Sequence, residues 1–243
     1  MDNTDLEQTL VLIKPDALKN SLTGYVLSQL SEFHTGLRFA GAKIVHVSDM
    51  LAKEHYAEHK GKTFYQTLIN YITGRIHYPD APWKQRVIAL VYMGPSAVSK
   101  IRSISGPTNP HSARDQCPGC IRSLGTLVPM KDKEGTVIGE YMENLIHASA
   151  SIEEAEREIK LWFKPNDIPP LMQVYPVEES KEHFYFESSN LHTAYKAGSI
   201  CLVAPGDPVW TSDMEILRKI AKNEPASDSL ESVAAKYMIN QGS

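Results

Sequence analysis

The sequence has few cysteines, no long apolar run and no excess of positive charge. Cys117, Cys120 and Cys201 are the three cysteines among 243 residues. They are too few, and odd in number, for a disulfide framework, so we expect reduced thiols. The longest uninterrupted apolar stretch, Val87 to Met93, is far shorter than the roughly 20 residues that span a bilayer. These shortages exclude a secreted disulfide scaffold and a helical membrane protein.

The charge balance narrows the class of protein further. Lysine and arginine number 25 against 29 aspartates and glutamates, which gives a formal net charge of −4. A protein that coats nucleic acid needs a basic face, so nucleic acid is at most a secondary partner. The opening Met-Asp-Asn-Thr-Asp-Leu-Glu is acidic where a secretory signal is basic and then apolar. We therefore expect a cytoplasmic globular protein with no membrane partner.

Apolar patterning predicts alternating strands and helices up to residue 163. Strands are predicted at Gln8 to Lys14, Phe39 to Val47, Val87 to Met93 and Asn144 to His147, with a hairpin of Thr126 to Met130 and Thr136 to Tyr141. Helices are predicted at Ser21 to Gly36, Ala52 to His59, Phe64 to Thr73, Ser96 to Ile104 and Ser151 to Phe163. Ser105 to Pro118, rich in Gly, Pro and Ser, is predicted to be an irregular loop. This order fits an α+β domain whose helices lie on a mainly antiparallel sheet.

The helix at Ser151 to Phe163 has the clearest signals. Ser151 with Glu154 three residues later forms a capping box. Ile152, Ala155, Ile159 and Trp162 are predicted to share its apolar face.

Residues 188–243 have a pattern of their own. A strand is predicted at Ser199 to Ala204, a helix capped by Thr211 at Asp213 to Lys222, and a second helix at Ser229 to Ile239. The segment is too small for a confident independent core. We therefore divide the chain into a domain of residues 1–187 and a small C-terminal α/β extension, packed on that domain or on a neighbouring subunit.

The segment from Asn144 to Ser151 carries the most informative combination of residues. His147 ends an apolar strand just before a helix begins, so one ring nitrogen can face a cleft while a carboxylate holds the other. Glu158 lies about two turns into that helix, on the face that Ser151 shares. This is what a nucleophilic imidazole needs. Taken alone, a core histidine bonded to a backbone carbonyl is the more common case.

Four short motifs in the right order resemble the nucleoside diphosphate kinase family. They are Leu12-Ile13-Lys14-Pro15-Asp16, Thr108-Asn109-Pro110, Ile121-Arg122 and Asn144-Leu145-Ile146-His147-Ala148-Ser149, and Glu153 to Phe163 extends the match. The resemblance covers about Gln8 to Glu187. It implies a ferredoxin-like α/β sandwich, a homo-oligomer, and ping-pong transfer of a γ-phosphate from a nucleoside triphosphate to a nucleoside diphosphate through a phosphohistidine.

Matching residue by residue implies the roles of single side chains. His147 would be the nucleophile, Glu158 its orienting partner and Ser149 the serine beside it. The nucleotide-binding positions would be Lys14, Tyr56, Phe64, Arg102, Thr108, Arg122 and Asn144, with Phe64 stacked on the base. Mg²⁺ is expected with the nucleotide and no metal in the empty protein, because the phosphates themselves usually hold this ion.

The types of these residues suit phosphoryl transfer independently of the resemblance. The reaction needs in-line positioning and neutralised oxygens, which a lysine, two arginines and a hydroxyl supply. Phe64 can stack on any base, and plain core packing of this ring is an equally good alternative. Tyr56 has a similar alternative as a half-buried tyrosine.

The sequence also departs from the family pattern. Pro107 stands where the family usually has an acidic residue, and Ala148 replaces a glycine. Extra residues lie around Arg75 to Gln85, within His111 to Gly119, and in the predicted hairpin before Asn144. The inserted Cys117-Pro118-Gly119-Cys120 lacks the second ligand pair of a structural zinc site, so two reduced loop cysteines are expected, with a disulfide or a metal site as the alternative.

A different class of function stays open. The chain could be a catalytically silent nucleotide-binding module with an assembly or regulatory role, whose extension is the interaction surface. His147 and Glu158 are both present, which favours the enzyme.

Overall fold

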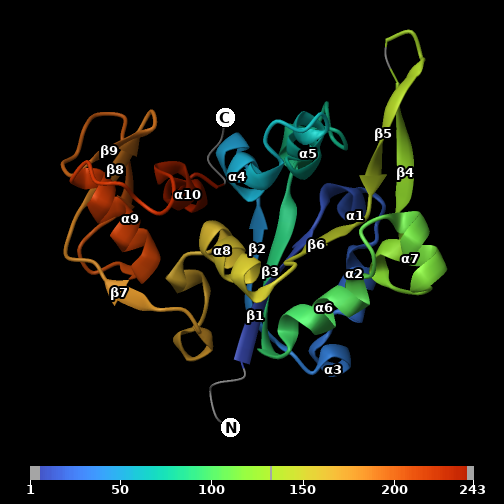
Figure 1. The fold of residues 1–243 in the computed structure, drawn as a ribbon, viewed down its shortest axis with the longest axis horizontal. Helices are drawn as coiled ribbons and strands as arrows, with labels where there is room; N and C mark the ends of the chain where they lie inside the picture. The colour runs from blue at the N-terminus through green and yellow to red at the C-terminus, as the bar shows by residue number, and fades with distance from the viewer. Residues whose placement is uncertain (1–5, 132, 240–243) are drawn as a thin grey trace.

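A four-stranded antiparallel sheet forms the centre of the computed structural model, which describes residues 6–131 and 133–239 (Figure 1). Its strands are β1 (Leu6–Ile13), β2 (Arg38–Val45), β3 (Val87–Pro95) and β6 (Ile146–Ala148), in the order β2-β3-β1-β6. All neighbouring strands run antiparallel, and β1 pairs with β3 from Leu6 and Pro95 to Ile13 and Ile88. The predicted α+β fold is confirmed. The acidic opening residues 1–5 lie outside the described part.

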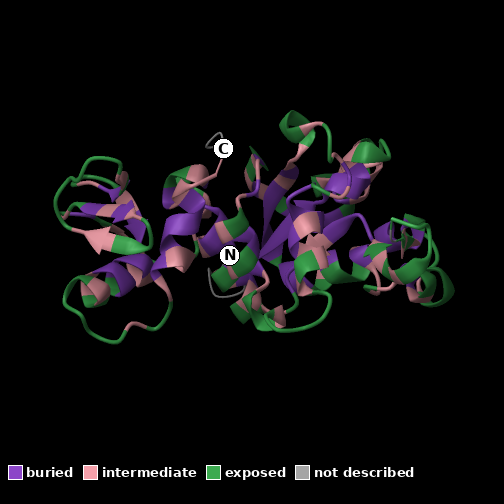
Figure 2. Cartoon of the chain, turned by 90° about the horizontal axis from the view of Figure 1, so that it is seen from above, coloured by how far each residue is buried: buried purple, intermediate pink, exposed green. Residues whose placement is uncertain are grey.

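Successive side chains of β1 enter two different cores, because neighbouring residues of a strand point to opposite faces of the sheet. Leu10 and Leu12 pack against α4 (Asp49–His55), α5 (Tyr65–Ile72) and α8 (Ile152–Trp162). Val11 and Ile13 pack against α1 (Pro15–Lys19), α2 (Thr23–Gln29) and α6 (Ala97–Ser105). Figure 2 shows the buried residues gathered along the sheet and the helix sides that face it. Helices cover both faces, which explains the continuous apolar runs of β1 and β3.

Two expectations about helix faces are wrong. The predicted helix at Ser21 to Gly36 is two helices, because Ser31 begins the short α3 (Glu32–Thr35) by accepting a hydrogen bond from the backbone N–H of His34. This change of phase turns Phe33 outward. Ile152, expected on the buried face of α8, is exposed because it is the first residue of the helix and precedes the turn that meets the core.

The predicted loop at Ser105 to Pro118 contains a helix, α7 (Pro110–Gln116). The Asn109 side chain caps it by accepting from the backbone N–H groups of His111 and Ser112, at 2.8 and 3.4 Å. Pro110 stands at the first helical position, where its missing N–H costs nothing. After α7 the predicted hairpin is confirmed as β4 (Thr126–Lys131) and β5 (Val137–Glu143), which projects from the body (Figure 1). Its turn includes residue 132, which lies outside the described part.

The C-terminal part forms two small sheets and two helices. β7 (Val177–Glu179) pairs with β11 (Pro208–Trp210), and β8 (Phe184–Glu187) pairs with β9 (Asn190–His192) and β10 (Ile200–Val203). The helices are α9 (Thr211–Ala221), whose cap residue is Trp210 rather than Thr211, and α10 (Leu230–Ala234). Short 3-10 turns complete the chain at Ala57–His59, Pro82–Lys84, Ile121–Leu124, Pro165–Asp167, Pro170–Met172 and Ala235–Tyr237. No helix of the described residues is long and apolar enough to cross a bilayer.

Trp210 joins the C-terminal part to the body. Its side chain is fully buried within the core that contains Leu10 and Trp162. Its indole N–H donates to the carbonyl of Phe163 at 2.8 Å. The predicted division after Glu187 falls between β8 and β9, two paired strands, and stays a prediction.

Candidate active site

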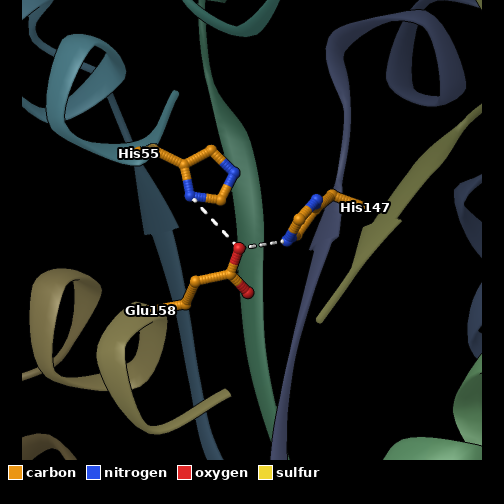
Figure 3. A group of neighbouring side chains, drawn as sticks. All are labelled: His55, His147 and Glu158. Atoms are coloured by element: carbon orange, nitrogen blue, oxygen red, sulfur yellow. Dashed lines mark ion pairs between the residues drawn. The ribbon is translucent and has the colours of Figure 1, made fainter. Parts of the chain in front are cut away.

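His147 and Glu158 meet between the sheet and α8. β6 places His147 opposite Leu12 of β1, and α8, which the Ser151 side chain caps, carries Glu158. The Nε2 atom of His147 lies 2.9 Å from Oε1 of Glu158 (Figure 3). The other ring nitrogen, Nδ1, lies on the side of the ring away from Glu158 (Figure 3). The carboxylate therefore holds one nitrogen and leaves the other available.

The Glu158 carboxylate is buried but well bonded. The Ser149 hydroxyl donates to its Oε2 atom at 2.6 Å and itself accepts from the backbone N–H of Leu10 at 3.2 Å. Burial opposes ionisation of Glu158, but the His147 ring, His55 and the Ser149 hydroxyl together outweigh burial and lower the carboxyl pKa to about 2. Glu158 is therefore an anion at any pH at which the protein would work.

His55 completes this cluster, and no sequence signal singled it out. Its Nδ1 atom lies 3.7 Å from Oε1 of Glu158, and its ring meets that of His147 edge to face at 4.5 Å between centroids. The indole N–H of Trp162 donates to the same Nδ1 atom at 3.3 Å. Burial lowers the pKa of His55 to about 3, so the ring is neutral near pH 7.

His55, His147 and Glu158 also have the spacing of a metal site. One donor atom from each lies within 4.8 Å of the others. However, the Trp162 N–H occupies the Nδ1 lone pair of His55, and the Ser149 hydroxyl binds the second carboxylate oxygen. The bonds in place fit an internal hydrogen-bond network better than a resident metal ion.

Lys14, Asn144 and Thr108 form a second group at the end of β1. The Lys14 ammonium donates to Oδ1 of Asn144, and the Asn144 amide donates to the carbonyl of Thr108 at 2.8 Å. Burial lowers the pKa of Lys14 to about 8. The lysine is thus a cation near neutral pH, fixed in position by its amide partner.

Asp16 sets the direction in which β6 begins. Leu145, two residues before His147, has a left-handed backbone conformation with φ of 68°. Its N–H donates to Oδ2 of Asp16 at 2.8 Å, and its carbonyl accepts from the N–H of Lys14 at 2.9 Å. The segment Lys14 to Asp16 therefore holds the kink that aims His147.

Arg122 is buried beside the nucleophile strand. Its guanidinium donates to the carbonyls of Gly106 and Ile146 at 2.9 and 3.2 Å. Burial, and then the charge of the exposed Arg102, lower the Arg122 pKa to about 10, so it remains a cation. Gly106 has φ of 79°, and a Cβ there would lie 2.2 Å from the Cys120 sulfur, so only glycine fits this loop.

Tyr56 packs against His55, and Phe64 follows through His59. The Tyr56 ring packs against His55 at 4.7 Å and against His59 at 6.0 Å between centroids. Phe64 meets His59 at 5.8 Å and is 48% exposed. Its exposure excludes the alternative of plain core packing, and the Lys62 ammonium lies 5.7 Å from the ring centroid.

Comparisons with known proteins show the family of this chain. A family model described as nucleoside diphosphate kinase matches residues 7–168, more than half of the chain. The chain belongs to the nucleoside diphosphate kinase family. Its activity is that of a nucleoside diphosphate kinase, a nucleotide-binding phosphotransferase. The nucleoside diphosphate kinase of Pyrococcus furiosus is 40% identical over 164 residues, a match that covers 68% of this chain and 87% of the relative.

Two solved kinases of the family have the same fold. The Halobacterium salinarum kinase in complex with CDP is 32% identical with a TM-score of 0.51, over 67% of this chain and 91% of that one. The Borrelia burgdorferi kinase, a transition-state mimic with vanadate and ADP, is 28% identical with a TM-score of 0.52, over 71% and 95%. The family match ends at residue 168, so α9, α10 and strands β7 to β11 lie beyond the kinase family region.

The three cysteines of this kinase are free. Cys117 and Cys120 stand at the two ends of a turn in which the Cys120 N–H donates to the Cys117 carbonyl at 3.1 Å. The Cys120 sulfur packs on Gly106, the residue whose carbonyl binds Arg122. The inserted turn therefore packs against the residue that holds the Arg122 guanidinium.

Proposed function

We propose that Nδ1 of His147 is the nucleophile that carries the γ-phosphate from a nucleoside triphosphate to a nucleoside diphosphate. The observation that carries this proposal is the 2.9 Å contact of Nε2 with Glu158, which leaves Nδ1 as the reactive nitrogen. In the first half-reaction an Nδ1–P bond forms as the bond from the γ-phosphorus to the β–γ bridging oxygen breaks, and the nucleoside diphosphate leaves. In the second half-reaction the diphosphate acceptor attacks the same phosphorus and frees the imidazole.

Glu158 and Ser149 prepare the ring for attack. Attack through Nδ1 places positive charge on the imidazole, and the buried, ionised Glu158 stabilises that charge through Nε2. Ser149 fixes the carboxylate by donating to its second oxygen. The neutral His55 ring packs against His147 without adding a competing charge.

Lys14, Arg102, Arg122, Thr108 and Asn144 bind the phosphates and the ribose. Lysine acts as a point charge, whereas arginine offers a planar set of donors that matches phosphate oxygens. The ADP and vanadate named for the Borrelia burgdorferi kinase support a phosphate site of this kind. Tyr56 and Phe64 border the base, and Phe64 stacks on it without selecting one base.

Mg²⁺ enters as part of the nucleotide substrate. The polar groups around the phosphate position are ammonium, guanidinium, amide and hydroxyl groups, which suit phosphate oxygens better than a divalent cation. Of the nearby carboxylates, Glu158 is already bonded to Ser149 and paired with His147, and Asp16 accepts from the backbone N–H of Leu145. The ion is therefore held by phosphate oxygens and water, the usual arrangement for Mg²⁺ with nucleotides.

Assembly and location complete the proposal. The chain forms a symmetric homo-oligomer, the usual outcome for a protein of this kind, and works in the cytoplasm. Residues 188–243 stabilise the kinase body rather than join its chemistry, because Trp210 packs far into that body. The silent-module alternative has no comparable support in the geometry of His147.

Incubation with γ-labelled ATP tests the proposal directly. We expect one acid-labile, base-stable phosphate per chain, mapped to His147 by mass spectrometry, and its loss on addition of a nucleoside diphosphate. Excess chelator should abolish labelling. A wild-type protein that binds nucleotide but takes up no label would favour the silent module, and a label on another residue would refute the assignment of His147.

A further inference from the structure

His77 lies in the insertion around Arg75 to Gln85, which the family resemblance leaves without a role. Its side chain is 1% exposed, and its Nε2 atom lies 3.0 Å from Oε1 of Glu143. Glu143 is the last residue of β5, in the inserted hairpin. Two insertions that lie far apart in the sequence therefore meet at a histidine–glutamate pair.

The His77 ring also reaches the phosphate site through an aromatic side chain. It packs edge to face on Tyr71 at 5.0 Å between centroids, and on Tyr141 at 6.4 Å. The Lys14 ammonium lies 4.5 Å from the centroid of the same Tyr71 ring. Tyr71 is thus in contact with both His77 and the lysine of the phosphate site.

Glu143 gives a second route to the same lysine. It directly precedes Asn144, whose side chain accepts from Lys14 and donates to Thr108. The other oxygen of Glu143 accepts from the Asn20 amide at 3.4 Å, so the carboxylate is held from two sides. The pair with His77 therefore fixes the chain at the point where the hairpin ends and the site begins.

We propose that His77 is a positioning residue for phosphate binding, which holds Glu143 and Tyr71 so that Asn144 and Lys14 keep the place and charge that the nucleotide needs. This inference rests on the proposed role of Lys14. It gives the two insertions a task within the kinase reaction, since each supplies one member of the pair.

The charge of Glu143 matters as well as its position. Burial lowers the pKa of Lys14 to about 8, Asp16 of α1 and Glu143 of β5 raise it, and Arg122 lowers it, with the Tyr71 ring face beside the ammonium. If Glu143 loses its charge, Lys14 gives up its proton at a lower pH. The alkaline limb of kcat/KM then moves to lower pH, an effect that packing alone does not produce.

Three variants of the full-length chain test the proposal by steady-state kinetics between pH 6 and pH 10. His77→Phe keeps an aromatic ring on Tyr71 but removes the bond to Glu143, and we expect KM for the nucleoside diphosphate to rise about tenfold with a smaller change in kcat. His77→Gln restores a donor and should return KM to within about threefold of wild type. Glu143→Gln removes the charge but keeps one oxygen that can accept from His77, and should move the alkaline limb of kcat/KM to lower pH.

A matched control comes from the C-terminal part. His192 faces Glu187 at 3.5 Å, a pair of the same kind remote from the site, so His192→Phe should leave KM and the pH profile unchanged. The inference is overturned if His77→Phe and Glu143→Gln keep wild-type KM and pH profile, or if they change only the melting temperature. That outcome leaves the proposed function intact, whereas a wild-type chain that takes up no label from ATP refutes the function itself.

Discussion

Two of the histidine–glutamate pairs, His147 with Glu158 and His77 with Glu143, have opposite burial. In the first, the His147 side chain is 21% exposed and Glu158 only 3%. In the second, His77 is 1% exposed and Glu143 is 14% exposed. The nitrogen–oxygen distances are almost the same, at 2.9 and 3.0 Å. The same contact can therefore serve catalysis or support. In the first pair the histidine is the more exposed member, as a nucleophile must be, whereas in the second pair it is the glutamate.

A nucleophile needs a ring nitrogen that a substrate can reach. His147 leaves Nδ1 on the side away from its carboxylate (Figure 3). The Nδ1 atom of His77 is buried, with no hydrogen-bond partner among the described residues. His77 can therefore support a site but cannot accept a phosphate, although its contact with a carboxylate is just as short.

Replacing each histidine gives the largest expected contrast between the pairs. His147→Ala should lower nucleotide exchange by about 10⁴-fold or more and remove the phosphoenzyme, because no other group in the described part of the chain is placed to accept the phosphate. His77→Phe should keep the label. Quantitative labelling with γ-labelled ATP measures both, and a His147→Ala protein that still takes up label would show that the two pairs have been given the wrong roles.

Weakening the packing of the C-terminal part should lower the stability of the protein without changing the activity at either histidine–glutamate pair. Trp210→Ala removes a fully buried indole and its bond to Phe163, so we expect a loss of about 3–5 kcal/mol in the free energy of unfolding. Activity per folded site should stay unchanged. Urea denaturation and active-site titration measure the two effects, with the exposed Trp83→Ala as control. Unchanged stability, or lost activity in the folded protein, would contradict the proposed role of residues 188–243.

Replacing Arg122 should lower the rate of the reaction at His147 more than it lowers the stability of the fold. Removal of a cation that meets charge in the transition state costs about 10²–10³ in kcat, so we expect that loss for Arg122→Ala. The control is Arg218→Ala in α9, which removes an arginine bonded to Glu178 and Glu182 and should leave kcat unchanged. A normal kcat in the Arg122 variant would mean that its bonds to Gly106 and Ile146 serve the loop alone.

The buried, neutral His55 beside the first pair should make the folded protein less stable in acid. Its pKa is about 3 in the folded chain, against about 6.5 when unfolded, so the unfolded state binds an extra proton between these values. The stability that His55 contributes is complete above pH 6.5 and falls as pH drops toward 3, by up to about 1.4 kcal/mol per pH unit.

His55→Gln, which keeps an acceptor for Trp162, should flatten that dependence in denaturation measurements from pH 7 to pH 4. The exposed His34→Gln serves as the control. An equally steep loss of stability in His55→Gln would show that His55 does not carry the proton.

The residues of the first pair could be predicted from the sequence, and those of the second could not. His147, Ser149 and Glu158 lie in motifs of one strand and the helix after it, so local spacing is enough to bring them together. His77 and Glu143 lie in insertions without a pattern, 66 residues apart, and their contact depends on how two loops fold over Tyr71. His55 was missed because an edge-to-face contact between rings leaves no sequence signal.

The errors in the fold have local causes. Strands β1, β2, β3 and β6 follow apolar runs and were predicted to within a few residues. The helix α7 was missed because Gly, Pro and Ser obscure its start, although Asn109-Pro110 is the cap signal that could have found it. The outward turn of Phe33 depends on a break at Ser31 that periodicity alone does not reveal.

Leu145 limits how this kinase can change by mutation. Its left-handed backbone, with φ of 68°, favours glycine or asparagine, whereas its side chain is 1% exposed in an apolar core. Glycine there would relieve the backbone but leave a cavity, and valine or isoleucine would fill the core but clash with the backbone. Each single exchange therefore gives up one of two requirements. This position, two steps from the nucleophile, should tolerate fewer substitutions in a saturation library than the other buried leucines.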